Sequence, residues 1–399
     1  MLKLLKGPLA FVVATMFLNF AGLTIIIPVI PYIVAQYTSS VALYVGFIMS
    51  TAALCQFLAS PALGYLSDIY GRRPILLFSL LGGVIGFIVF GIGGALWVLF
   101  LGRIIDGLTA GDTPAMYAYI ADVSKPHDRA RLYGVLGAAG GFGFLIGPAI
   151  GGFAAQWGLS VPLYVAAALS LANAIWGYFV MPESLAKTNR VTTFEVKHLS
   201  PIRQFQHVFT SETLRLLFIA TFFFFVALIM QQSNFSVFLK DILKWGPTQI
   251  GIVLTVVGAI DILSQGYLTG KLLPLLGEKK LASIGLIITA FGMVLIGTVA
   301  FIPSAVLLYI AVVIYTLGDG LFEPAMSGLI SNAAEPQMQG RIQGANQGTQ
   351  SIARVVAPLI AAGLYEWGAY LPYYTSAGIM IVVLVGLVVF RSQLQTRTS

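Results

Sequence analysis

The sequence predicts an all-α membrane protein with twelve transmembrane helices in two six-helix repeats. Three observations support this fold class: the composition, the spacing of apolar runs and an internal repeat. Of the 399 residues, 58% are hydrophobic and only 9% are charged, and the mean hydropathy is +0.90. A soluble domain usually carries about 25% charged residues. This chain has too little polar surface to face water, so the bilayer is its natural solvent.

Apolar runs of about 20 residues, the length that crosses bilayer hydrocarbon, recur along the whole chain. The first six fall near 8–34, 41–63, 75–94, 96–122, 131–155 and 161–182. The second six fall near 213–238, 247–270, 280–302, 304–330, 340–363 and 371–390. A long polar stretch separates the two sets. We therefore predict an N-terminal bundle over 1–182, a linker over 183–212 and a C-terminal bundle over 213–399.

The two halves match each other at one constant offset of 210 residues over about 55 positions. The matched positions include Pro114-Ala115-Met116 with Pro324-Ala325-Met326, Arg131 with Arg341, and Pro148 with Pro358. Chance similarity between apolar segments would not keep one register. The repeat therefore predicts two parallel six-helix units around a central cavity.

The distribution of positive charge predicts the orientation. With the N-terminus in the cytoplasm, 18 of the 22 Lys and Arg residues lie in cytoplasmic segments. Lys240 and Lys244 would lie outside, while Arg103 and Arg354 fall within predicted spans. We expect a multi-pass protein of the cytoplasmic membrane with both termini in the cytoplasm.

The remaining composition argues against several function classes. The net charge of +7 is spread over short tracts between apolar runs, which does not suit nucleic-acid binding. Cys55 is the only cysteine and all three histidines fall in polar segments, so no metal site is predicted. The sequence has no Gly-rich loop followed by Lys and Ser or Thr, so coupling to ATP is not expected.

A charged, Gly-rich segment follows the second predicted helix and contains Gly64, Asp68, Gly71, Arg72 and Arg73. The glycines allow a tight turn. Asp68 can accept hydrogen bonds from a neighbouring helix N-terminus or pair with an Arg. Such a contact can hold one conformation until it is pulled apart. The alternative is an ordinary Gly-rich turn flanked by positive charges.

The fifth predicted helix carries Gly143, Gly147, Pro148 and Gly151 among further glycines. Glycine in a helix costs about 1 kcal/mol relative to alanine, yet small residues let membrane helices approach closely. A proline within the helix adds a kink. We expect close helix packing here, either as general packing or as part of the transport movement.

These two segments resemble signature motifs of the major facilitator superfamily, and the second is similar to the motif of its drug:proton antiporters. Other segments resemble the tetracycline and multidrug efflux branch, namely Pro28-Val29-Ile30-Pro31, Gly102-Arg103 with Gly107, and Met181-Pro182-Glu183-Ser184. The resemblance implies proton-coupled export. Two departures argue against tetracycline as the substrate. Asn19 is uncharged where family members often carry an acid, and the stretch around Thr289 is uncharged where some tetracycline pumps carry one.

Seven charged residues away from the ends of the predicted spans are candidates, because an ionisable group costs roughly 2.5–3.5 kcal/mol at mid-helix. They are Arg103, Asp106, Asp112, Asp261, Asp319, Glu323 and Arg354. Arg103 and Asp106 are three residues apart, so they can pair and serve structure or conformational coupling. Asp112 lies about a third of a turn round the same predicted helix from Asp106. It either pairs with a neighbouring group or acts in transport.

Asp319 and Glu323 lie one turn apart on one face of the tenth predicted helix. Two carboxylates in a low dielectric do not both ionise readily. Because no histidine lies within a span, such an acid is the natural proton carrier, and Asp319 is the first candidate because it lies nearer mid-span. Asp112 and Asp261 are further candidates for proton coupling, with binding of a cation as the competing role for Asp261.

Neutral polar residues on the seventh and eleventh predicted helices supply candidate substrate contacts. The predicted substrate site consists of Asn19, Asp112, Gln231, Gln232, Asn234, Asn346, Gln350 and Arg354.

The leading hypothesis is a proton-coupled antiporter that exports amphipathic, cationic or zwitterionic small molecules by alternating access. No bound cofactor is expected, because the proton gradient supplies the free energy. The expected partners are the substrate, protons and membrane lipid, and the protein is expected to act as a monomer. The alternatives are a lipid or lysolipid flippase, in which Arg354 holds a phosphate, and a proton-coupled metabolite transporter. A membrane-embedded enzyme would need a nucleophile–base pair or metal ligands, which the predicted spans lack.

Overall fold

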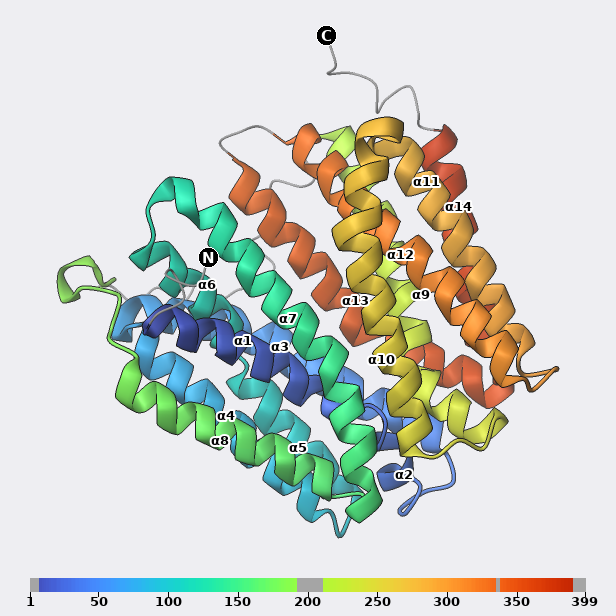
Figure 1. Cartoon of the computed structure of the whole chain (residues 1–399), viewed down its shortest axis with the longest axis horizontal. Helices are drawn as coiled ribbons and strands as arrows, with labels where there is room; N and C mark the ends of the chain where they lie inside the picture. The colour runs from blue at the N-terminus through green and yellow to red at the C-terminus, as the bar shows by residue number, and fades with distance from the viewer. Residues whose placement is uncertain (1–6, 192–210, 335–337, 390–399) are drawn as a thin grey trace. The chain divides into compact units, whose positions relative to one another are not determined.

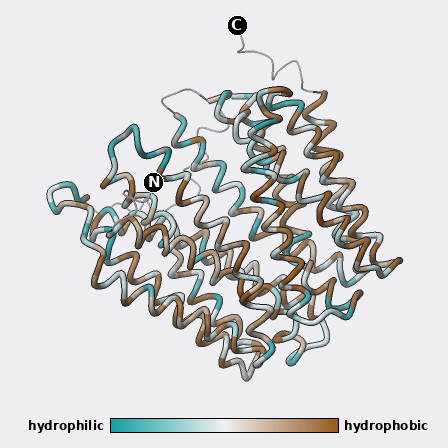
Figure 2. Tube along the Cα trace, in the orientation of Figure 1, coloured by the Kyte–Doolittle hydropathy of each residue, from teal (hydrophilic) through white to brown (hydrophobic). Residues whose placement is uncertain are grey.

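The computed structural model describes residues 7–191, 211–334 and 338–389, and the described residues form helices without strands (Figure 1). Most of the predicted linker over 183–212 and both chain ends therefore lie outside the described residues. Large apolar side chains are exposed along many helices, including Trp367 at 85% and Phe179 at 79%. Figure 2 shows hydrophobic residues along the length of most helices. Such a surface suits contact with lipid, as the composition predicts.

Eight α-helices precede the linker region. They are α1 (Pro8–Ile25), α2 (Ile30–Val34), α3 (Val41–Tyr70), α4 (Arg72–Ile92), α5 (Leu96–Thr109), α6 (Asp112–Val123), α7 (Pro126–Ala154) and α8 (Val161–Val180). Gly71 (φ 111°) and Gly93 (φ 62°) flank α4. Both lie in the left-handed region, which is accessible to glycine without a steric penalty. These glycines explain why α4 begins and ends where it does.

Six α-helices follow the linker region, with one π-helical segment among them. They are α9 (Glu212–Ile242), α10 (Pro247–Leu263), the π-helix η6 (Ser264–Leu268), α11 (Thr269–Thr298), α12 (Ala305–Ala333), α13 (Gln339–Trp367) and α14 (Leu371–Val389). Ser211 and Ser304 cap α9 and α12 by accepting a bond from a backbone N–H of the first turn. Gly277 (φ 71°) lies inside α11, where the backbone bends.

Two predicted helices are wrong as continuous elements. The run over 8–34 is interrupted between α1 and α2, where Pro28 has no N–H to donate and the backbone turns. The run over 96–122 is interrupted at Ala110 and Gly111, between α5 and α6. Elsewhere the predicted helices exist, but several extend further; the second, for example, continues to Tyr70 rather than residue 63.

The count of twelve spans stays a prediction. Within the described ranges, nine helical stretches are long and apolar enough to cross a bilayer, and one of them, Pro247–Thr298, has 52 residues and covers two predicted spans. Because the chain breaks between α5 and α6, neither of these helices is long enough to count as one of the nine. The helix α13 is also not counted, because it carries many polar residues in its first half.

Contacts between residues divide the chain into two compact units. The N-terminal unit contains Met1–Ser39, Thr51–Pro201 and Gly246–Thr255, and the C-terminal unit contains Ser40–Ser50, Ile202–Trp245 and Val256–Ser399. The first residues of α3 thus belong to the C-terminal unit, and the first residues of α10 belong to the N-terminal unit.

Candidate proton and substrate sites

The turn between α3 and α4 contains a cluster of paired charges. Asp68 lies in the last turn of α3 and not in the loop, and its Oδ1 pairs with Nη1 of Arg72 at 2.5 Å. Arg72 is 7% exposed and also bonds through Nε to Oδ2 of Asp122, at the end of α6, at 3.2 Å. Asp122 in turn accepts a bond from the Ser184 hydroxyl at 2.9 Å. The predicted pairing of Asp68 with an Arg is therefore present in the structure.

The N-terminus of α4 is capped by Glu183, which sequence reasoning did not place there. Its two carboxylate oxygens accept bonds from the backbone N–H groups of Arg72 (2.9 Å) and Arg73 (3.3 Å). A carboxylate at this position complements the helix dipole. Glu183 follows α8, 110 residues further along the chain, so only the fold brings it to the turn. The cluster thus joins the ends of α3, α4, α6 and α8.

The interruption between α5 and α6 is built by hydrogen bonds from two other helices. Ala110 turns the chain (φ −73°, ψ 67°), and the Gly111 N–H donates to the Thr109 carbonyl at 2.8 Å. Ser60 of α3 donates to the Ala110 carbonyl at 2.9 Å, and Ser79 of α4 accepts a bond from the Gly111 N–H at 3.2 Å. These side chains satisfy backbone groups that the broken helix leaves unpaired.

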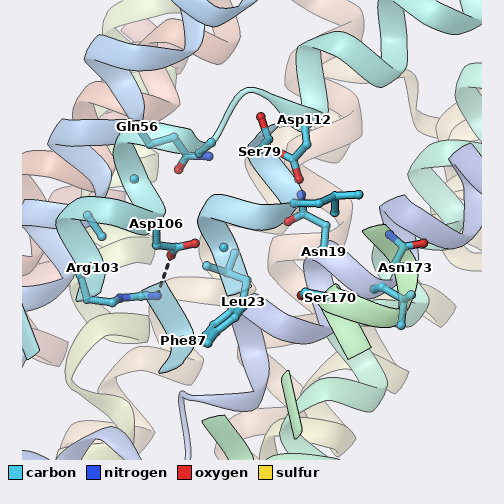
Figure 3. A pocket seen from close by; sticks show the side chains of 16 residues that line it. Asn19, Leu23, Gln56, Ser79, Phe87, Arg103, Asp106, Asp112, Ser170 and Asn173 are labelled. Carbon is cyan, nitrogen blue, oxygen red and sulfur yellow. Dashed lines mark hydrogen bonds and ion pairs between the residues drawn. The ribbon is translucent and has the colours of Figure 1, made fainter. Parts of the chain in front are cut away.

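A polar cavity of about 100 Å³ lies inside the N-terminal unit beside this interruption (Figure 3). Side chains from six helices line it, including Asn19, Gln56, Ser79, Arg103, Asp106 and Asp112. The predicted Arg103–Asp106 pair is present, with Nη1 and Oδ2 2.9 Å apart. Asp112 is only 9% exposed, and its Oδ1 accepts a bond from the backbone N–H of Thr113 at 2.9 Å. Because the helix breaks before Asp112, its predicted angular relation to Asp106 was wrong.

The glycines of α7 bring its backbone against that of α1. A Cβ atom added at Gly147 would lie 2.6 Å from the carbonyl oxygen of Ala21, and one at Gly143 would lie 2.9 Å from the amide nitrogen of Ala21. A Cβ at Gly151 would lie 2.8 Å from the carbonyl carbon of Ile25. Real Cβ atoms do not approach so closely, so any larger residue separates the two helices. The predicted close packing is confirmed.

In the C-terminal unit, Asp319 is buried on α12 without an ionic partner. It is 8% exposed, its Oδ1 has no hydrogen-bond partner, and no cation pairs with it among the described residues. The charged groups that act on it are two further acids, Asp261 and Glu323. Phe322, between the two acids of α12, stacks on Phe224 with ring centroids 3.9 Å apart. Asp319 thus lies among acids in an apolar setting.

Asp261 is held beside the π-helix η6, and η6 and the first residue of α11 bond α12 on the two sides of Asp319. The Gln265 amide donates to Oδ1 of Asp261 at 2.9 Å. Ser264 donates to the Leu317 carbonyl at 3.0 Å, and Thr269 donates to the Gly320 carbonyl at 2.8 Å. π-helical turns occur frequently at functional sites. Sequence reasoning did not identify Gln265 or the π-helix.

Arg354 of α13 is the cation that acts on this acid cluster. It interacts electrostatically with Glu323, which is half-buried and also lies within range of Asp261. The side chain of Arg354 is exposed. Of the three acids, Glu323 is the one on which Arg354 acts.

The predicted amide residues fall into two groups. Gln231, Asn234 and Asn346 are buried, and each has at least one polar side-chain atom without a hydrogen-bond partner. Gln232 is exposed, and Gln350 is half-buried. Buried unsatisfied amides are costly unless water or a ligand pairs with them. Gln231, Asn234 and Asn346 remain candidates for substrate contact, whereas the side chain of Gln232 lies on the exposed side of α9.

Buried, unpaired acids and a closely packed, glycine-rich helix in a helical membrane protein suit a transporter. The chain belongs to the Major Facilitator Superfamily, whose family model matches residues 12–238 and again residues 217–398. This membership confirms the transporter class and the all-helical membrane fold predicted from the sequence, while the count of twelve spans stays a prediction.

Similar proteins fit the same family. The chain is 31% identical to tetracycline resistance protein class C of Escherichia coli, with 91% of each chain covered. It is 28% identical to multidrug resistance protein 2 of Bacillus subtilis (strain 168), over 92% of this chain and 91% of the relative. Among solved structures, the nucleoside transporter NupG has a TM-score of 0.78 at 14% identity, with 98% and 99% of the two chains covered. That likeness shows the fold alone.

Proposed function

We propose that this protein is a proton-coupled exporter of amphipathic small molecules that carry a positive or zwitterionic charge. It works in the cytoplasmic membrane as a monomer with both termini in the cytoplasm. The proton gradient supplies the free energy, and no bound cofactor is needed. The names of the relatives support export of toxic compounds, since one is a tetracycline resistance protein and another a multidrug resistance protein.

The observation that supports this proposal most strongly is the burial of Asp319 without a cationic partner among the described residues. An isolated ionised carboxylate inside a membrane protein is costly, so such a group binds a proton or acquires a cation. Asp319 has no cationic partner among the described residues, and the neighbouring charges on it come from Asp261 and Glu323. The cluster therefore favours holding at least one proton. A residue that takes up and releases a proton within the bundle is what proton coupling requires.

The tight contact of α12 with its neighbours supports this role. A Cβ atom added at Gly318 would lie 2.5 Å from the amide nitrogen of Thr289, and one at Gly320 would lie 2.6 Å from Cβ of Ser264. The backbone on both sides of Asp319 is thus held in direct contact with α11 and η6. A change in the charge of Asp319 acts on helices that touch it, which suits conversion of protonation into movement.

Tetracycline itself is not the substrate that the site favours. Thr289, where some tetracycline pumps carry an acid, is fully buried and donates to the Gly285 carbonyl at 2.8 Å. It serves contact between α11 and α12. Asn19 lines the N-terminal cavity as a neutral amide. The two alternative functions, a lipid flippase and a proton-coupled metabolite transporter, have no support from the names of these two relatives.

The test is uphill transport in inverted membrane vesicles energised with an acidic interior. Wild-type protein should accumulate ethidium, and an uncoupler should abolish accumulation. Asp319→Asn should lose at least about 90% of uphill accumulation at matched expression. Asp241→Asn is the matched carboxyl control, because Asp241 pairs with Lys240 near the end of α9. Accumulation that persists in the presence of the uncoupler would contradict proton coupling.

A further inference from the structure

The cavity in the N-terminal unit has an excess of negative charge. Arg103 is 5% exposed and pairs with Asp106, so these two charges offset each other. Asp112 is more than nine-tenths buried, and no ion pair joins it to a cation in the part of the chain that the structure describes. The neighbouring charge on it is that of Asp106. When Asp112 is ionised, the cavity needs one further positive charge.

The cavity wall suits a cation that carries N–H groups. Asn19 and Gln56 place amide groups around the same space as the two acids (Figure 3), and Ser79 adds a hydroxyl. Carboxylate and amide oxygens accept bonds from ammonium or guanidinium N–H groups. Leu23 and Phe87 supply apolar surface for the carbon chain behind the charged nitrogen.

The size and composition of the cavity limit the choice of ligand. A drug-sized molecule needs about 300–1,000 Å³, whereas this cavity offers about 100 Å³. It can admit a charged head group but not a whole amphipathic molecule. An anion would meet two acids and an arginine that is already paired. A metal ion would need several acidic or imidazole ligands, and the described residues contain no group of three or more that could hold one.

We propose that this cavity binds the ammonium or guanidinium head group of the transported molecule, with Asp112 as its counter-ion. The inference rests on the proposed export of cationic molecules and adds a location for their charge. Substrate charge is then bound in the N-terminal unit, while the proton is carried on α12 in the C-terminal unit. Proton and substrate therefore compete through conformation and not for the same carboxylate.

The test measures binding of hexylguanidinium to purified full-length protein by isothermal titration calorimetry, with neutral hexylurea as the matched probe. Asp112→Asn keeps an oxygen to accept the Thr113 N–H but removes the charge. It should weaken binding at least tenfold. Asp241→Asn should bind hexylguanidinium within twofold of wild type, and hexylurea should bind at least tenfold more weakly than hexylguanidinium.

A second variant fills the cavity without changing any charge. A Cβ added at Gly83 meets only Oδ1 of Asp106, at 3.9 Å, so the backbone there faces open space. Gly83→Val should therefore also weaken hexylguanidinium binding at least tenfold, even if Asp112→Asn fails to fold.

Three results would overturn this inference: no binding to wild type, equal binding of hexylurea, or loss of binding in Asp319→Asn with full binding in Asp112→Asn and Gly83→Val. None of these depends on whether wild-type vesicles show proton-driven accumulation, so the failure of this site and of the proposed function are distinguishable.

Discussion

The helix pair α5–α6 and the helix α12 occupy equivalent positions in the two sequence repeats, yet they are built differently. Pro114 of α6 corresponds to Pro324 of α12. The N-terminal copy is interrupted at Ala110 and Gly111, whereas α12 continues from Ala305 to Ala333. In the first copy, hydroxyl groups of α3 and α4 bond the freed backbone. A polar cavity lies beside the interruption in the first copy, whereas the continuous helix α12 buries Asp319.

The charges of the two regions differ in the same way. Asp68 and Asp106 are each paired with an arginine, and Glu183 caps a helix. Among the described residues, no cation pairs with Asp319. Paired charges hold helix ends together. An apolar setting disfavours the charged form of an unpaired acid, so such an acid can bind and release a proton instead of staying ionised. The comparison assigns conformational control to the paired N-terminal charges and proton exchange to the C-terminal acids. Asp112, which no cation pairs with among the described residues, is the N-terminal exception and belongs to the proposed head-group site.

The largest effect should come from separating α7 from α1. Gly147→Leu places a branched side chain where a Cβ alone would lie 2.6 Å from the Ala21 carbonyl oxygen. Transport should fall below about 5% of wild type, because α7 can no longer reach its packed position. Ethidium export in vesicles and the amount of membrane-inserted protein measure this together. Gly134→Leu is the control, because a Cβ at Gly134 meets nothing within 4 Å; equal loss in both variants would remove the special role of the packed face.

A smaller but clear effect should follow from loss of the α4 cap. Glu183→Gln keeps the shape of the side chain but removes the negative charge that complements the helix N-terminus. We expect a reduction of about tenfold in the rate of export with little change in the substrate concentration at half-maximal rate. Steady-state export kinetics provide the measurement. An unchanged rate with a large change in that concentration would place Glu183 in substrate binding.

Loss of the Asp68 pair should cost somewhat less, since Arg72 keeps Asp122 as a second acidic partner. Asp68→Asn should lower turnover severalfold while binding of hexylguanidinium stays within twofold of wild type. Calorimetry and export kinetics on the same preparation separate the two quantities. A variant that mainly loses affinity would show that the α3–α4 turn contacts substrate and does not control conformation.

The smallest effect should be a change in pH dependence. Glu323→Gln removes one of the two negative charges that act on Asp319. Fewer negative neighbours make release of a proton from the cluster easier, so the pH profile of export should move toward lower pH by about half a unit or more. Export rates between pH 5.5 and 8.5 measure this. Gln350→Glu is a useful counterpart, because it adds a carboxyl at a half-buried position of α13 instead of removing one. A pH profile that moves in neither variant would show that Glu323 does not take part in proton exchange.

The sequence was sufficient for contacts that are local and insufficient for those that the fold creates. Arg103 and Asp106 lie three residues apart on one helix, so helical spacing predicts that pair. Asp68 and Arg72 lie four residues apart across the turn at Gly71, so their closeness in sequence makes the pair possible. The glycines of α7 also showed their packing role by spacing alone. By contrast, the break at Gly111 depends on Ser60 and Ser79, which lie on other helices.

Two further features needed the three-dimensional structure. Glu183 reaches the N-terminus of α4 from beyond α8, and no local pattern specifies that encounter. The π-helix η6 has an ordinary apolar and polar sequence, and its contact with α12 beside Asp319 is a tertiary one. Burial also separated Gln231 from Gln232, neighbours in sequence that a helix turns toward different surroundings.

The central claim is that Asp319 carries the exchanged proton, and the most direct measurement follows protons and substrate together. Proteoliposomes that contain pyranine report internal pH while ethidium moves down its own gradient. Wild-type protein should move protons in the opposite direction to ethidium. Asp319→Asn should still let ethidium equilibrate, because the N-terminal cavity is unchanged, but without proton movement. Proton movement by Asp319→Asn at the wild-type ratio to ethidium would contradict the claim and leave Asp112 or Asp261 as the carrier.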